Sequence, residues 1–87
     1  MHVGDMGAQI SLALDNLEMV LRQAGLSMSD VMRLNYYTTD VDRFLEFAEV
    51  VGKRMGETGC RAASTLLGVT RLAFPELLVE IEATAVA

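Results

Sequence analysis

The sequence predicts an α+β fold in which two helices cover one face of a β-sheet, with the order helix, strand, helix, strand, strand. In two segments apolar residues recur three and four positions apart, as they do on one face of a helix. Three other segments are rich in β-branched and aromatic residues or alternate in period two, as strands do. The 87 residues are short enough that positions 1–87 are expected to form one domain.

The first helix is expected to begin after Asp5, because aspartate is a favoured N-cap residue. Gly25 suits the C′ position that ends a helix. The apolar stripe between them consists of Met6, Ile10, Leu14, Leu17, Leu21 and Ala24. A stripe of this width indicates a helix that lies flat on the sheet.

Residues 30–38 are expected to form the first strand, which is rich in β-branched and aromatic side chains. The second helix follows, with Asp40 in the segment that caps its start and Gly56 as the predicted end. Its apolar stripe consists of Val41, Phe44, Ala48, Val51 and Met55. This helix is therefore expected to cover the same face of the sheet as the first.

The last two predicted strands differ in pattern. Residues 64–70 are almost continuously apolar, which is typical of a strand buried on both faces. Residues 77–84 alternate apolar and polar side chains, as expected of a strand with one face in solvent. Pro75 lies between them in a predicted loop, where it removes no hydrogen bond from the sheet.

Composition and charge restrict the classes of function that the chain can have. Twelve acidic residues against seven basic ones give a net charge of −5, and the basic residues are scattered, which argues against a nucleic-acid partner. One cysteine, Cys60, and one histidine cannot supply a zinc-ligand set, and no cofactor is expected. The absence of a signal-peptide pattern and of a membrane-spanning run predicts a cytoplasmic protein with no membrane partner.

The apolar content also predicts self-association. Hydrophobic residues make up 52% of the chain, which is high for a small domain with a large relative surface. Surplus apolar surface on a protein of this kind usually marks an interface. We therefore expect the chain to pair with copies of itself.

Several short motifs occur together in a fixed order. Leu14-Asp15-Asn16-Leu17 is followed by Ala24-Gly25-Leu26, and later by Ala63-Ser64-Thr65 and Glu80-Ile81-Glu82-Ala83. In this order and spacing the chain resembles the Rid family, also called YjgF-like or endoribonuclease L-PSP proteins. The resemblance covers Gly4 to Ala83 and implies a single Rid-like domain with a chorismate-mutase-like fold. It also implies that the chain is N-terminally shortened, because it begins after the family's N-terminal hairpin.

The resemblance implies a homotrimer with ligand clefts between subunits. Deaminases of the family hydrolyse enamine or imine intermediates, such as 2-aminoacrylate, to 2-keto acids and ammonia. Their arginine binds the substrate carboxylate, and in this chain that position holds Ser64. Glu80 matches the family glutamate that positions water, so it is the candidate catalytic residue.

Three further residues are candidates for ligand binding. Ser64 and Thr65 offer hydroxyl groups to a small carboxylate. Arg61 is either a substitute for the missing arginine or an ordinary loop arginine in solvent. Glu80 itself either acts as a general base in a cleft or lies on the solvated side of a strand without a catalytic role.

Two functions remain open from the sequence. The first is a Rid-like protein that binds a small carboxylate or carbonyl metabolite and hydrolyses enamines or imines. The alternative is a non-catalytic, small-molecule-binding or chaperone-like trimeric protein. Ribonuclease activity, to which one of the family names refers, is disfavoured by the acidic charge and the lack of a histidine and lysine catalytic set.

Overall fold

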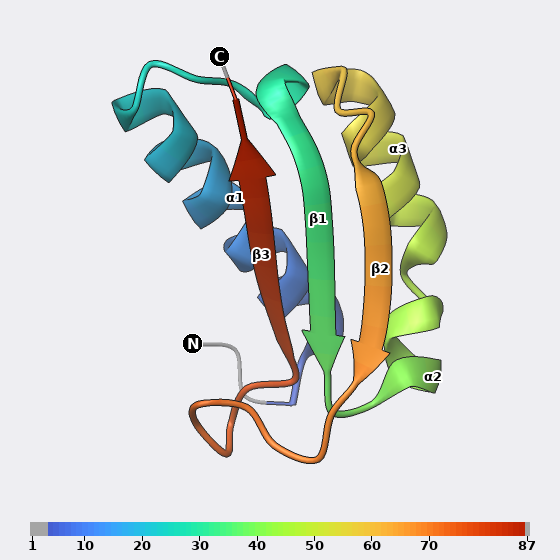
Figure 1. The fold of residues 1–87 in the computed structure, drawn as a ribbon. Coiled ribbons are helices and arrows are strands. Elements are labelled where there is room, and N and C mark those ends of the chain that lie inside the picture. The colour runs from blue at the N-terminus through green and yellow to red at the C-terminus, as the bar shows by residue number, and fades with distance from the viewer. Residues whose placement is uncertain (1–3, 87) are drawn as a thin grey trace.

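A computed structural model describes residues 4–86 of the chain. Its elements are α1 (Met6–Gln23), a 3₁₀ turn η1 (Met28–Asp30), β1 (Val31–Thr38), α2 (Val41–Leu45), α3 (Ala48–Thr58), β2 (Ala63–Gly68) and β3 (Val79–Ala85). The strands form one sheet in the order β2-β1-β3, parallel between β1 and β2 and antiparallel between β1 and β3. The helices lie together behind this sheet (Figure 1). The predicted α+β architecture, with the helices on one face of a mixed sheet, is confirmed.

Both predicted ends of α1 are confirmed. The Asp5 carboxylate accepts a hydrogen bond from the backbone N–H of Ala8 at 3.0 Å, as an N-cap residue does. Gly25 follows the helix with φ +77°, a conformation that glycine adopts without strain. The apolar stripe supplies the core with the buried side chains Met6, Ile10, Leu14 and Leu21.

The second helical segment differs from its prediction, because it is interrupted at Glu46 and Phe47. Phe47 turns inward against α1, and a Cβ atom added at Gly7 would lie only 2.7 Å from the Phe47 ring. Glycine at position 7 therefore allows this close approach. The segment also ends later than predicted, at Thr58 rather than at Gly56, because Gly59 is the residue in the left-handed conformation.

The expectation that the second predicted strand, residues 64–70, is buried on both faces is wrong for the single chain. Five of the six residues of β2 are exposed, and only Leu66 is half-buried. β2 lies at the edge of the sheet and pairs with β1 alone. Among residues 4–86, helices cover one face of the sheet and nothing covers the other, so an apolar run is left in solvent.

The strand register determines which side chains share a face. Tyr36, which is buried toward the helices, lies opposite Leu66 and Ile81. Each next residue along a strand points to the other side. The face away from the helices, called the open face below, therefore carries Asn35, Tyr37, Thr65, Leu67, Glu80 and Glu82.

Buried polar side chains fix the segment that joins β2 to β3, called the β2–β3 loop (residues 69–78). Gln9 of α1 is only 5% exposed, and its side chain donates to the Glu76 carbonyl at 3.0 Å and accepts from the Leu78 N–H at 2.7 Å. The Thr38 hydroxyl donates to the Leu78 carbonyl at 2.7 Å. The end of this loop is thus bound to both α1 and β1.

We predict that Gln9→Ala lowers the free energy of unfolding by about 1–3 kcal/mol, because it leaves partly buried backbone groups of the loop without their partner. Denaturant unfolding of the variant and the parent protein measures the change. Gln23→Ala is the matched control, since Gln23 is an exposed glutamine at the end of the same helix. Equal losses in the two variants would contradict this role of Gln9.

Candidate functional site

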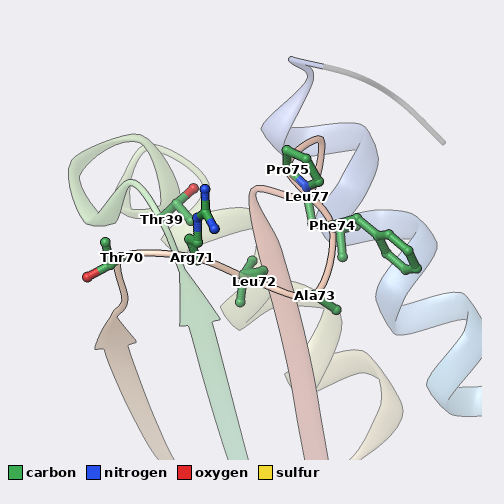
Figure 2. A pocket seen from close by; sticks show the side chains of 8 residues that line it. All are labelled: Thr39, Thr70, Arg71, Leu72, Ala73, Phe74, Pro75 and Leu77. Carbon is green, nitrogen blue, oxygen red and sulfur yellow. The ribbon is translucent and has the colours of Figure 1, made fainter.

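The β2–β3 loop encloses a pocket of about 380 Å³ at the end of β1 (Figure 2). One of its lining residues, Arg71, is charged, and the lining consists of Thr39, Thr70, Arg71, Leu72, Ala73, Phe74, Pro75 and Leu77. Figure 2 shows the Arg71 side chain extending to the same side of the loop as Thr39, whereas Phe74 points away from both. The pocket therefore combines a cation and two hydroxyl groups with an apolar wall.

The candidate catalytic residue Glu80 contacts this loop. It is half-buried near the start of β3, and its Oε1 atom accepts a hydrogen bond from the backbone N–H of Ala73 at 3.2 Å. The carboxylate thus holds the middle of the loop, while Gln9 and Thr38 hold its end. One oxygen of Glu80 is used in this way, and its Oε2 atom makes no hydrogen bond within residues 4–86.

The candidate ligand-binding residues are not gathered around Glu80. Ser64 lies opposite Leu34 on the helix side, where it lines a separate, mostly apolar pocket of about 390 Å³ with Tyr36 and Leu66. Thr65 points to the open face, one row of side chains away from Glu80 and two strands across. Arg61 is exposed before β2 starts.

A polar cluster on the open face was missed by sequence reasoning. The Glu82 carboxylate accepts hydrogen bonds from Asn35 Nδ2 at 2.9 Å and from the Tyr37 hydroxyl at 3.1 Å. The hydrogen bond from Asn35, followed by that from Tyr37, lowers the pKa of Glu82. The hydrogen bond that Tyr37 donates to Glu82 raises the pKa of Tyr37, because the carboxylate holds the phenolic proton. The period-two pattern of β1 predicts that its alternate side chains share one face. Only the register between β1 and β3 places that face beside Glu82.

Within residues 4–86 no three His, Cys, Asp or Glu side chains lie close enough together to hold a metal ion. In the same range no helix is both long and apolar enough to cross a bilayer. Cys60 is buried in the core as a free thiol.

The fold is that of the YjgF-like proteins: the solved structure of the E. coli YjgF gene product matches 95% of this chain with a TM-score of 0.86 and 27% identity. The model of the family described as endoribonuclease L-PSP matches residues 1–87. The chain therefore belongs to the endoribonuclease L-PSP family, which is also called the Rid family.

Individual relatives agree with this assignment. The RutC family protein PH0854 of Pyrococcus horikoshii is 34% identical over 94% of this chain and 63% of its own length. The Rid family protein YyfB of Yersinia pestis is 40% identical with a TM-score of 0.85, over 97% of this chain and 64% of that one. TdcF of E. coli, solved with bound serine, is 29% identical with a TM-score of 0.87, over 97% and 66%. The chain thus spans between 63% and 66% of the length of these three proteins.

We predict that Asn35→Ala raises the pKa of Glu82, because the first cause of its lowering is lost, and that Tyr37→Phe does the same by a smaller step. A carboxyl ¹³C NMR titration measures both. The Glu82 contribution to stability is present above its unfolded-state pKa, and it is lost as the pH falls through the lowered folded-state value. Asn16→Ala, an exposed change on α1, is the control. An unchanged Glu82 titration in Asn35→Ala would contradict the cluster.

Proposed function

We propose that this chain binds a small metabolite with a carboxylate or carbonyl group. The observation that carries the proposal is its similarity, over 97% of its length, to TdcF, whose structure holds serine. Serine is a small carboxylate, and the family resemblance points to 2-keto acids and their enamine or imine precursors. The Arg71 pocket offers this chain a site of suitable charge and size.

The proposed reaction is the hydrolysis of an enamine or imine such as 2-aminoacrylate. After tautomerisation to the imine, water adds to the C=N carbon, and the C–N bond then breaks to release ammonia and pyruvate. Glu80 is the proposed base that takes a proton from this water. Its Oε1 atom is held by the Ala73 N–H, which orients the free Oε2 atom.

The proposed assembly is a homotrimer with the ligand cleft between subunits. The uncovered edge of β2 and the open face support it, since Leu67 is 43% exposed there in a single chain. An unpaired edge strand with apolar side chains favours association. The net charge of −5 supports small-molecule rather than nucleic-acid partners. A cytoplasmic location is part of the proposal, because the chain has a single cysteine and no disulfide to form within itself.

We predict that the parent protein sediments at about three times the mass of one chain, and that Leu67→Glu shifts it toward the monomer. A charged side chain on an apolar interface loses its hydration without gaining a partner. Sedimentation velocity measures the effect. Met19→Glu, at an exposed apolar position on α1, is expected to leave the mass unchanged. A monomeric parent protein, or a Leu67→Glu variant that stays trimeric, would contradict the proposed interface.

A second candidate function is non-catalytic binding of a small molecule, which includes a chaperone-like role. The favouring observation is the placement of Ser64, which stands where the family deaminases have arginine and points to the helix side, away from Glu80. A substrate next to Glu80 would then lack its usual carboxylate partner at this position. Binding without hydrolysis is the expected result of that arrangement.

We predict that the parent protein accelerates imine hydrolysis and that Glu80→Gln lowers the rate at least about 100-fold, because glutamine cannot act as a base. An amino-acid oxidase generates 2-imino acids, semicarbazide traps them, and the rate of keto-acid release is measured. Glutamine still accepts the Ala73 hydrogen bond, so Glu80→Gln separates proton transfer from loop geometry, which Glu80→Ala does not. Glu57→Gln on the exposed side of α3 is the control. No acceleration by folded protein would favour the non-catalytic function.

A further inference from the structure

We propose that the pocket inside the β2–β3 loop binds the carboxylate of a small 2-keto acid, with the Arg71 guanidinium as its ionic partner. This inference rests on the proposed function, since it names a binding site for the metabolite. It differs from the residues that the sequence offered for that purpose, because none of Arg61, Ser64 and Thr65 lines the pocket. Four observations support it: an unpaired charge, two available hydroxyl groups, a suitable size and a fixed wall.

The charge of Arg71 is not neutralised within the chain. Among residues 4–86 no carboxylate lies within ion-pair distance of its guanidinium, whereas Arg54 contacts both Asp15 and Glu18. Nearby acids have other contacts: the Asp40 carboxylate caps α2 by accepting from the Arg43 N–H at 3.1 Å, and Glu80 accepts from the loop backbone. Arg71 is therefore available to an external anion, and its planar group suits a carboxylate with two parallel hydrogen bonds.

Two threonine hydroxyls add donors to the same pocket. Thr39 and Thr70 line it together with Arg71, and neither hydroxyl has a hydrogen-bond partner among the described residues. Thr38, the neighbour of Thr39, is different, because its hydroxyl is already used by the Leu78 carbonyl. A hydroxyl that is still free can donate to a ligand carboxylate or to a keto oxygen.

The size and the apolar wall indicate the rest of the ligand. A volume of about 380 Å³ lies within the usual range for small-molecule pockets. The apolar residues of the lining are Leu72, Ala73, Phe74, Pro75 and Leu77. An apolar side chain on the ligand would cover this wall, which favours a 2-keto acid with a branched aliphatic chain over pyruvate.

The pocket is shaped before a ligand binds. Gln9 and Thr38 hold the end of the loop, and Glu80 holds its middle through the Ala73 N–H. A loop that is already ordered loses less entropy on binding. Glu80 is thus a positioning residue for this pocket, whatever it does in proton transfer.

The test is a calorimetric titration of the full chain with 4-methyl-2-oxopentanoate, compared with pyruvate, inorganic phosphate and the uncharged ketone 4-methylpentan-2-one. We expect the branched keto acid to bind more tightly than the other three. Arg71→Gln should weaken its binding at least about tenfold, and Arg71→Lys by less, since lysine keeps the charge but not the paired hydrogen bonds. Arg22→Gln, which removes an exposed arginine of α1, should change nothing.

The outcomes separate this inference from the proposed function. Binding that is unaffected by Arg71→Gln places the carboxylate elsewhere and overturns the inference, while small-molecule binding stands. No keto-acid binding by the parent protein, or tighter binding of phosphate or of the ketone, also overturns it, and the imine assay then decides the function independently.

The role of Glu80 has its own readout. Glu80→Ala should weaken keto-acid binding, and Glu80→Gln should restore it, because the amide oxygen accepts the same Ala73 hydrogen bond. Equal binding by all three proteins would contradict the positioning role.

Discussion

The pairing of β1 with both of its neighbours is the constraint on which the rest of the structure depends. β1 is the central strand, parallel to β2 and antiparallel to β3, so its register decides which side chains of three distant segments share a face. A shift of one residue between β1 and β3 would turn either Tyr36 or the apolar face of β3 out of the core, because paired residues point to the same face. The same register brings Glu82 to Asn35 and Tyr37, and it places Glu80 beside the loop that follows β2.

Features with local causes could be predicted from the sequence. The N-cap at Asp5 and the helix end at Gly25 depend on a few neighbouring residues, and both are as expected. The interruption at Phe47 depends on a contact with Gly7, forty positions earlier, and no periodic pattern reports it. The apolar run in β2 correctly indicated a strand but not its exposure, because burial depends on which layers cover the sheet. The site shows the same division: Glu80 was named from a motif, whereas the pocket around Arg71 exists only once the loop is folded.

Glu80 combines two properties that a motif cannot separate. Its carboxylate is a hydrogen-bond acceptor for the loop and, with the second oxygen, a candidate base for water. A residue with both properties couples the shape of the Arg71 pocket to the chemistry proposed beside it. This coupling also explains why an alanine variant alone is ambiguous, since it removes the acceptor and the base together.

Ser64 and Arg71, the two positions considered for binding an acid group, differ in charge and in surroundings. On the helix side, Ser64 lines a mostly apolar pocket that would receive a charged group poorly. Across the loop, Arg71 offers a guanidinium without an internal partner and a wall already fixed by α1, β1 and β3. A carboxylate ligand requires a cation close to it in space, and that cation can come from any position in the sequence. The proposed site for the acid group is therefore the loop after β2 rather than the start of that strand.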